Sequence, residues 1–240
     1  QEQLNILKKF KLMNTISPIL NIMIKACEKA SKVIIRDFGE VENLQVKKKG
    51  PKDFVTKTDK RVEEILINEL EKSKKNYSFI TEETGIINKS DTDNYWIIDP
   101  IDGTTNFLHG IPHFAISVAL KSKNEITNGL IFDPIKNEIF YAEKNIGSFF
   151  NNRRIRVSKK IELEDCLFAT NHAGAAYSKL HLRFSGCAAL DLAYVACGRF
   201  DGYFQNKINI WDIAAGTLIV QESGGKVNDI NKFDIDNIDI

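Results

Sequence analysis

The sequence lacks both a membrane-spanning segment and a secretion signal. No apolar run approaches the roughly 20 residues that a membrane helix needs, and residues 1–11 contain neither the apolar stretch nor the cleavage site of a signal peptide. A net charge is also missing, because 33 basic and 32 acidic residues leave a formal charge of +1. Attraction of the whole protein to nucleic acid or to an anionic membrane is therefore excluded, although a local basic patch is not. We expect a cytosolic protein.

Cysteine, proline and repeated sequence are scarce. The 240 residues include five prolines and four cysteines, and we find no internal repeat or long polar tract. With 43% hydrophobic and 27% charged residues, the composition excludes a mainly disordered chain and suits one globular unit with room for two lobes. The cysteines form no C-x-x-C pair, so we expect buried, reduced thiols and not disulfides or zinc ligands. They are Cys27, Cys166, Cys187 and Cys197.

Apolar residues at helical spacing predict four helices, and alternating or continuous apolar runs predict strands. The expected helices span residues 16–38, 58–75, 188–196 and 212–222. Gly39 is expected to stop the first helix, and Thr58 to cap the second after an extended piece at residues 54–56. The expected strands span residues 77–80, 95–98, 167–170 and 200–205, with one more around Val227 and an antiparallel meander over residues 115–157. The strand at 95–98 is expected to stop at Pro100, which cannot donate to a sheet ladder.

Acidic residues stand where these elements end. They are Asp59 near the start of a helix, Glu82 and Glu83 after a strand, Asp99 and Asp102 in a turn, and Asp212 at the start of a helix. Each alone is explained as a helix cap or a solvated turn. Two like charges 4 Å apart repel by about 4 kcal/mol at an effective dielectric of roughly 20, so this many carboxylates can share a pocket only if cations lie between them. Cations held in this way can acidify a bound water.

The segment DPIDGTTNF, from Asp99 to Phe107, is the most informative. Pro100 stiffens the turn, and Gly103 lets the backbone approach a ligand. The helix that begins at Thr104 presents free N–H groups that favour an anion. With two carboxylates at its mouth, the segment is typical of a site where hard cations bridge protein and phosphate.

Haloacid-dehalogenase-type phosphatases also place an acid and the letters DGT after a strand. Their two aspartates are two positions apart, whereas Asp99 and Asp102 are three apart. This spacing is expected to point the second side chain elsewhere. That family's other motifs are not evident either, so we rank this alternative low.

Four motifs follow one another along the chain. They are DFVTKTD at residues 53–59, FITEE at 79–83, WIIDPIDGTTNF at 96–107, and WDIAAG at 211–216 with ESGG at 222–225. In order and spacing they resemble the motifs of the inositol monophosphatase family, the magnesium-dependent, lithium-sensitive phosphatases. The resemblance implies a layered αβαβα sandwich of the inositol monophosphatase and fructose-1,6-bisphosphatase type. It also implies one lobe of helices and an antiparallel sheet over residues 12–160, and a second lobe with a mixed sheet over residues 161–240.

The resemblance implies a set of metal ligands. They are Glu82, Asp99, the backbone carbonyl of Ile101, Asp102 and Asp212. Asp99 would be shared by a first and a second Mg²⁺, and a third, looser ion would sit near Glu82. Glu83 is expected to stay outside the metal shell.

The resemblance also implies catalytic and substrate-binding residues. Thr104, with Asp59 behind it, would orient a water on the first metal beside Glu82, and no covalent intermediate is needed. The implied substrate contacts are Asp102, Asp212, Gln205 and the backbone N–H groups of Gly103, Thr104 and Ala188.

The function implied by the resemblance is Mg²⁺-dependent hydrolysis of a small phosphorylated polyol by a cytoplasmic homodimer, with inositol monophosphate as the first candidate. Hydrolysis of fructose 1,6-bisphosphate or of a nucleotide 3′-phosphate is the alternative within the class. A regulatory protein associated with RNA or transcription, which keeps the fold, is the alternative of another class. No membrane partner is expected, and nucleic acid is not the expected ligand.

The chain departs from the family pattern in three places. Family members usually have further strand and helix between residues 170 and 183 and after residue 237. These segments are either lost from the protein or absent from this sequence. Gln205 stands where many members have a glutamate that binds a substrate hydroxyl, so we expect weaker selection for inositol. His109 and His113 are interpreted as ordinary loop histidines, because the carboxylates already suffice for Mg²⁺.

Overall fold

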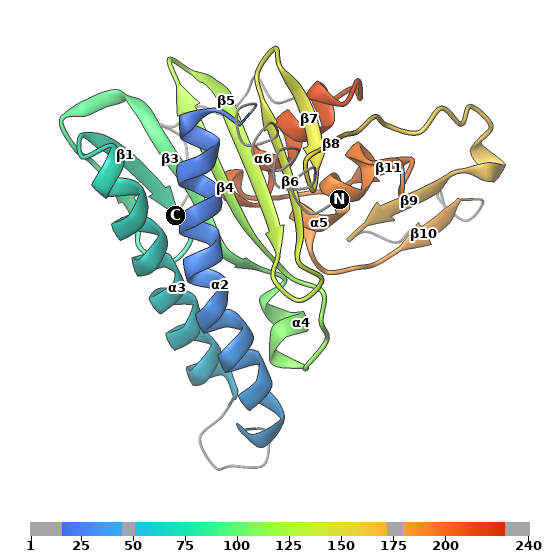
Figure 1. The fold of residues 1–240 in the computed structure, drawn as a ribbon. Helices are drawn as coiled ribbons and strands as arrows, with labels where there is room; N and C mark the ends of the chain where they lie inside the picture. Colours follow the sequence, from blue (N-terminus) through green and yellow to red (C-terminus); the bar gives the residue numbers. More distant parts are fainter. Residues whose placement is uncertain (1–15, 45–50, 172–179, 229–240) are drawn as a thin grey trace, which may run out of the picture.

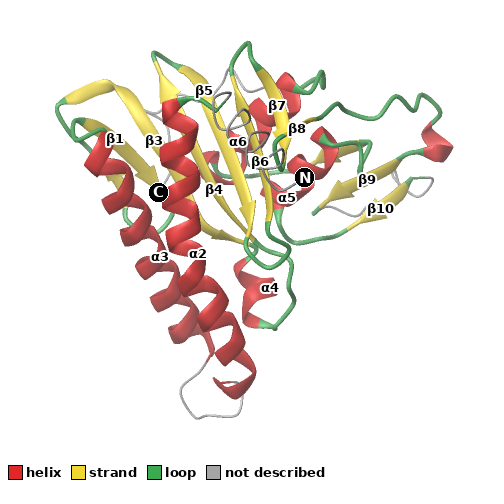
Figure 2. Cartoon of the chain, in the orientation of Figure 1, coloured by secondary structure: helices red, strands yellow, loops and turns green. Residues whose placement is uncertain are grey.

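The computed structural model describes residues 16–44, 51–171 and 180–228, which form two sheets with helices beside and between them (Figure 1). The large sheet has eight strands in the order β2-β1-β3-β4-β5-β6-β7-β8. They are β1 (Tyr77–Thr81), β2 (Gly85–Ile87), β3 (Asp91–Asp102), β4 (Ala115–Ser122), β5 (Glu125–Asp133), β6 (Glu138–Glu143), β7 (Gly147–Phe150) and β8 (Arg153–Arg154). Figure 2 distinguishes these strands from the helices and loops.

The large sheet is antiparallel except where β1 pairs with β3. The antiparallel meander predicted for residues 115–157 is confirmed as β4 to β8. Its turns contain residues with positive φ, mostly asparagines, which tolerate the left-handed region better than most side chains. These asparagines are Asn124, Asn137, Asn145, Asn151 and Asn152.

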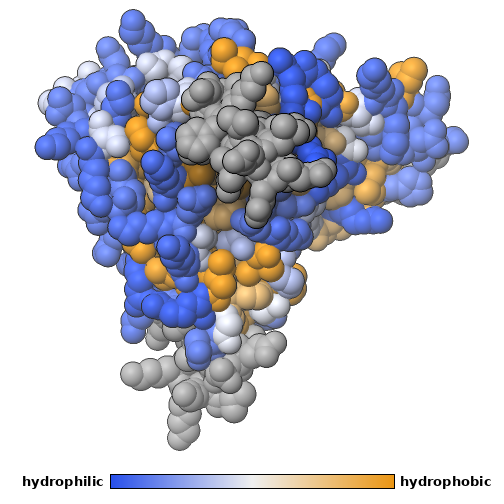
Figure 3. All heavy atoms as spheres, viewed as in Figure 1, coloured by the Kyte–Doolittle hydropathy of each residue, from blue (hydrophilic) through white to orange (hydrophobic). Residues whose placement is uncertain are grey.

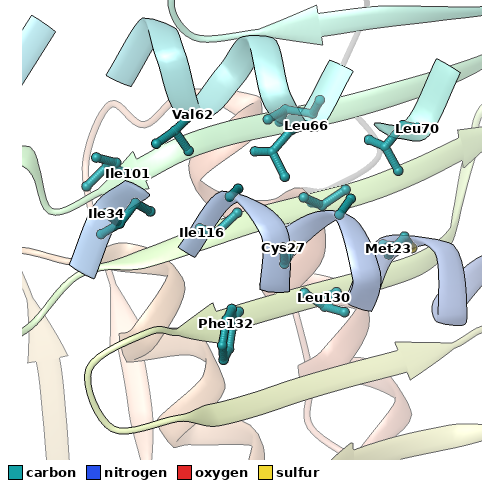
Figure 4. Close-up of a cluster of buried hydrophobic side chains, with 14 of the residues drawn as sticks. Met23, Cys27, Ile34, Val62, Leu66, Leu70, Ile101, Ile116, Leu130 and Phe132 are labelled. Atoms are coloured by element: carbon teal, nitrogen blue, oxygen red, sulfur yellow. The ribbon is translucent and has the colours of Figure 1, made fainter. Parts of the chain in front are cut away.

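Two long helices, α2 (Pro18–Leu44) and α3 (Pro51–Ser73), lie side by side over one face of the large sheet (Figure 1). Their apolar stripes meet the sheet in a core of buried hydrophobic side chains (Figure 4). The side chains labelled there from the helices are Met23, Cys27, Ile34, Val62, Leu66 and Leu70, and those from the sheet are Ile101, Ile116, Leu130 and Phe132. Each large apolar side chain buried in this way stabilises the fold by about 1.5–3 kcal/mol.

The opposite face of the large sheet is covered by α5 (Ala188–Ala196) and α6 (Ile210–Glu222). Helix α6 approaches β5 so closely that a Cβ on Gly129 would lie 2.7 Å from the Ala215 carbonyl oxygen. Helix α5 also contacts a second sheet of three parallel strands, in the order β10-β9-β11. They are β9 (Leu167–Thr170), β10 (His181–Arg183) and β11 (Gly202–Phe204), preceded by the short helix η1 (Leu163–Asp165). The layers are therefore helices, sheet, helices, sheet.

Both predicted boundaries around the first two helices are wrong. Helix α2 continues past Gly39 to Leu44, because Val41, 1% exposed, extends its buried stripe and offsets a glycine cost of about 1 kcal/mol. Helix α3 begins at Pro51 and not at Thr58, since proline is well suited to the first helical position. Thr58 is buried within α3, and its hydroxyl donates to Asp37 Oδ2 on α2 at 2.9 Å.

The described C-terminal segment and the surface complete the fold. The strand predicted around Val227 is wrong, because residues 225–227 form neither helix nor strand. The face shown in Figure 3 is mainly hydrophilic along α2 and α3. None of the helices in the described part of the chain combines the length and the apolar composition needed to cross a bilayer. The division into lobes over residues 12–160 and 161–240 stays a prediction.

Candidate active site

Asp99 and Asp102 lie on β3, where this strand carries one residue more than its neighbour β4. Asp99 is opposite Ser117 and Asp102 is opposite Ala115, so three steps along β3 match two along β4. Such a bulge turns residues three positions apart to the same face, so Asp99 and Asp102 lie on the same side of β3. The strand also continues through Pro100, contrary to prediction, because the ladder is already interrupted there and needs no N–H.

Asp99 is the centre of an acidic cluster. It is 1% exposed, and the charges of Glu82, Asp102 and Asp212 act on it. Glu82 directly follows β1, and its N–H donates to the Ile98 carbonyl at 3.3 Å. Asp212 lies in the first turn of α6 and accepts the Asn209 N–H at 3.2 Å. Two strands and a helix thus bring together three acids that are far apart in the sequence.

Burial raises the pKa values throughout this cluster. Burial, and then the charges of its acidic neighbours, raise the pKa of Asp99 well above its usual range. Burial also raises the pKa of Glu82 to about 7, although part of that side chain reaches solvent, and it raises the pKa of Asp212. For Asp102, burial raises the pKa to about 7 against the lowering effect of a backbone hydrogen bond. Without cations, the cluster therefore keeps protons at neutral pH.

The N-terminus of α5 holds Asp102. Asp102 Oδ2 accepts the Ala189 N–H at 2.5 Å, and the Cys187 thiol donates to the same oxygen at 3.2 Å. Ala188, a predicted substrate contact, is the first residue of α5. The partial positive charge of the helix N-terminus favours a carboxylate at this place.

The loop after Asp102 requires glycine. Gly103 has a φ of +95°, and a Cβ there would lie 3.0 Å from the His113 carbonyl oxygen. The five-residue helix α4 (Thr104–Leu108) follows directly. The Thr104 hydroxyl donates to the Ile101 carbonyl at 3.0 Å, so a predicted metal ligand and a predicted catalytic residue are in direct contact.

Asp59 lies on α3 and is 3% exposed. Burial, followed by the charges of Glu83, Glu82 and Glu63, raises its pKa to about 8. Its Oδ1 atom is buried and has no hydrogen-bond partner within the described residues. The predicted pairing with Thr104 is not present, because that hydroxyl donates to Ile101.

Two further buried acids were not predicted from the sequence. Glu63 is 1% exposed and accepts the Glu83 N–H at 2.9 Å, which joins α3 to the end of β1. It follows Asp59 by four residues, so the helical period is a signal that could have identified it. Asp191, 3% exposed on α5, accepts the Ser185 hydroxyl at 2.7 Å, and burial raises its pKa to about 7. No motif in the sequence marks Asp191.

Gln205 is linked to the acidic cluster by its contact with Tyr203. It directly follows β11, and its side-chain oxygen accepts the Tyr203 hydroxyl. Burial, and then the charges of nearby aspartates, raise the pKa of Tyr203, which places this ring beside the acids. Tyr203 was not predicted from the sequence.

The two histidines after α4 differ in their surroundings. His109 is exposed at the end of that helix. His113 packs against Tyr194, and burial, followed by the charge of Lys136, lowers its pKa. Neither ring is among the groups that perturb the acidic cluster.

The donor set of the cluster fits Mg²⁺. Every side chain in it offers carboxylate oxygen, the ligand type that hard cations prefer. Asp59 and Asp99 each keep a buried oxygen without a partner in the described residues. No group of three His, Cys, Asp or Glu side chains there is already spaced as a finished metal site. The carboxyls instead lie close enough to Asp99 for their charges to raise its pKa, and bound cations would replace the protons that this favours.

Comparison with known proteins identifies the family. The model of the inositol monophosphatase family matches residues 15–237. Inositol-1-monophosphatase of Mesorhizobium japonicum is 44% identical over 230 residues, which cover 90% of this chain and 86% of the relative. Nus factor SuhB of Pasteurella multocida is 41% identical over 230 residues, with the same coverage of 90% and 86%.

A solved structure agrees with the fold. The crystal structure of extragenic suppressor protein suhB from Bartonella henselae matches with a TM-score of 0.79 at 46% identity, covering 87% of this chain and 86% of that one. The predicted fold class, that of the inositol monophosphatase and fructose-1,6-bisphosphatase type, is confirmed. The described residues form four of the five predicted layers, and the second sheet is parallel within them and not mixed. With matching motifs, fold and acidic cluster, this chain belongs to the inositol monophosphatase family.

Proposed function

We propose that this protein hydrolyses a phosphorylated polyol, inositol monophosphate in the first place, to the free polyol and phosphate. The observation that carries the proposal is the set of acids gathered at the ends of β1 and β3 with raised pKa values. A cluster of this charge has no structural use, because unpaired buried carboxylates oppose folding. It suits a site that binds cations together with a phosphate.

The proposed metal ligands are Glu82, Asp99, Asp102, Asp212 and the carbonyl of Ile101, for two or three Mg²⁺ ions. When bound, these ions neutralise carboxylate and phosphate charge and lower the pKa of a water molecule. Asp99 is the best placed to be shared, since it contacts both Glu82 and Asp212.

The protein's own groups position the reactants. Thr104 and Asp59 orient the attacking water beside Glu82, and the unpartnered Asp59 oxygen offers an acceptor for it. The N–H groups of Gly103 and Thr104 receive phosphate oxygens, because the positive φ of Gly103 exposes the backbone there. Water attacks phosphorus directly and the polyol leaves, so no phosphorylated protein side chain forms.

The remaining groups face the polyol. We assign this role to Asp102, Asp212, Ala188 and Gln205. An inositol carries hydroxyl groups around its ring. The four residues offer these hydroxyls carboxylate, backbone N–H and amide partners. We further propose a cytoplasmic, lithium-sensitive homodimer, and the four free cysteines support a reducing compartment.

The alternatives have specific support. Fructose 1,6-bisphosphate and a nucleotide 3′-phosphate carry the same phosphate and would use the same metals. A role in transcription is favoured by one observation, the 41% identity to a relative named Nus factor SuhB. The intact acidic cluster argues for hydrolysis in addition to any such role.

The first assay measures phosphate release from inositol 1-phosphate, with about 5 mM Mg²⁺ and with EDTA. The second assay measures capture of RNA by the same protein. We expect Mg²⁺-dependent release that is abolished in Asp99→Asn. If the protein captures RNA and releases no phosphate from inositol 1-phosphate, fructose 1,6-bisphosphate or a nucleotide 3′-phosphate, the proposal is overturned in favour of the regulatory role.

A further inference from the structure

One side chain links the two halves of the proposed site. Asn106 lies in α4 and is 8% exposed. Its Nδ2 group donates two hydrogen bonds of 2.8 Å, one to the His113 carbonyl and one to the Ser185 carbonyl. The second bond joins residues 79 positions apart. It connects the loop after β3 to the segment that leads into α5.

Ser185 in turn anchors the start of α5. Its hydroxyl group accepts a hydrogen bond from the Cys187 N–H at 3.2 Å, and its O–H donates to Asp191 Oδ1 at 2.7 Å. Between them, Gly186 has a φ of +77°, and a Cβ there would lie 3.2 Å from Asn106 Nδ2. We call Asn106, Ser185 and Gly186 the clamp.

The clamp leads back to the acidic cluster. The first turn of α5, which Ser185 anchors, donates to Asp102 through the Ala189 N–H and the Cys187 thiol. Asp102 is four residues before Asn106, so the contacts form a closed circuit from β3 through α4 and α5 and back to β3. Loosening Asn106 therefore frees α5 to move relative to Asp102.

The chemistry of the amide explains why asparagine serves here. Both partners are carbonyl oxygens, so the position requires two N–H donors on a short side chain. A carboxylate would turn an oxygen toward two carbonyls, and an apolar side chain would leave both carbonyls without this donor.

We propose that Asn106 is a positioning residue that holds the N-terminus of α5 against Asp102 and thereby sets the substrate side of the site. The consequence for substrate rests on the proposed phosphatase function. The consequence for the position of α5 does not, and it is measured separately.

The first measurement is hydrogen–deuterium exchange of peptides covering residues 186–192, in the full-length protein without substrate. We expect Asn106→Ala and Asn106→Asp to increase exchange there by about tenfold, the effect of one net hydrogen bond. The matched control is Asn94→Ala, which removes a 2.8 Å hydrogen bond from Nδ2 to Asp91 near the start of β3. It should leave residues 186–192 unchanged.

The second measurement is steady-state hydrolysis of inositol 1-phosphate at saturating Mg²⁺. We expect the Asn106 variants to raise KM by about tenfold and to change kcat less, because α5 contacts the substrate side and not the attacking water. If the Asn106 variants do not fold, Gly186→Ala is expected to show the same two effects, because the added methyl group would press on the Asn106 amide.

The outcomes separate this inference from the proposed function. Unchanged exchange over residues 186–192 would overturn the clamp, and so would increased exchange with an unchanged KM, which indicates packing alone. A wild-type protein that hydrolyses nothing would contradict the proposed function. The position of α5 would then still be tested by hydrogen–deuterium exchange. The increase in melting temperature caused by Mg²⁺, compared between the wild type and the Asn106 variants, would replace KM as the second measurement.

Discussion

The apolar layer beneath α2 and α3 and the two most buried acids of the cluster, Asp59 and Asp99, affect stability in opposite ways. Met23, Leu66 and Leu70 are fully buried among other apolar side chains. Asp59 and Asp99 are nearly as buried, and each keeps an oxygen atom without a partner in the described residues. Burial stabilises the first region and opposes the second unless cations neutralise the charge. The comparison shows that the protein is held together in one place and is adapted for function in another.

The largest expected effect is on activity, from Asp99→Asn. Turnover should fall at least about a thousandfold, because Asp99 is the proposed shared ligand of two metals. In EDTA at pH 8, the melting temperature should stay the same or rise, since a neutral amide removes one acid from a buried cluster of like charges. Phosphate release and thermal unfolding measure the two effects.

A matched control for Asp99 is another fully buried aspartate. Asp133 pairs with Lys136 at 2.5 Å and accepts the N–H of Ile135. Asp133→Asn should lower the melting temperature and leave turnover of the folded protein unchanged. An Asp99→Asn protein that keeps most of its activity at saturating Mg²⁺ would contradict the two-metal assignment.

The corresponding change in the apolar layer is Leu66→Ala. It should lower the free energy of unfolding by about 2–5 kcal/mol, because it leaves a cavity under α3. Turnover per folded molecule should not change. Urea unfolding followed by circular dichroism measures the loss. Such substitutions usually lower the free energy of unfolding by about 2–5 kcal/mol, so a decrease below about 1 kcal/mol would show that this layer is less tightly packed than described.

The third prediction concerns pH in the absence of divalent cations. Burial raises the folded-state pKa of Asp59 to about 8, and of Glu82 and Asp102 to about 7, above the values of about 4 in the unfolded chain. The folded state then binds more protons, so its stability is greatest below about pH 4 with respect to these groups and falls as pH rises through 7 to 8. The melting temperature in EDTA should therefore fall between pH 5 and pH 8.

Mg²⁺ and one substitution sharpen this prediction. Mg²⁺ should raise the melting temperature, most strongly at pH 8, because only the folded state binds it and the carboxylates must be deprotonated. Asp59→Asn should reduce the slope in EDTA. A melting temperature that is flat or rises from pH 5 to pH 8 in EDTA would show that the cluster is not destabilising.

The smallest expected effect comes from the edge of the cluster. Gln205→Glu should increase kcat/KM for inositol 1-phosphate relative to glycerol 2-phosphate by about tenfold, since a charged acceptor forms the stronger hydrogen bond. The companion variant Tyr203→Phe removes the hydroxyl that donates to Gln205. If the ratio does not change in Gln205→Glu, the side chain at position 205 does not contact the polyol.

Much of the site could be predicted because its residues stand in local patterns. The end of β1 follows from an apolar run that stops at acids, and Gly103 with Thr104 follows from a glycine placed before a helix. The end of β3 does not, because this strand runs past the predicted stop at Pro100 to Asp102. Glu63 and Asp191 were missed because each lies inside a helix, where an acid is ordinarily solvated. Tyr203 was missed because its role depends on a contact with Gln205 beside aspartates from other elements.

By itself, the sequence determined the order of most elements, the antiparallel meander and the family, since periodicity, turn residues and motifs are local properties. Tertiary structure decided that Asp99 and Asp102 face the same way, because the bulge exists only through the pairing of β3 with β4. It also decided that α2 continues through Gly39. Burial of Val41 in the core outweighs the cost of about 1 kcal/mol for a glycine within a helix. Long-range pairing and burial involve residues that no local window contains, so only the folded chain determines them.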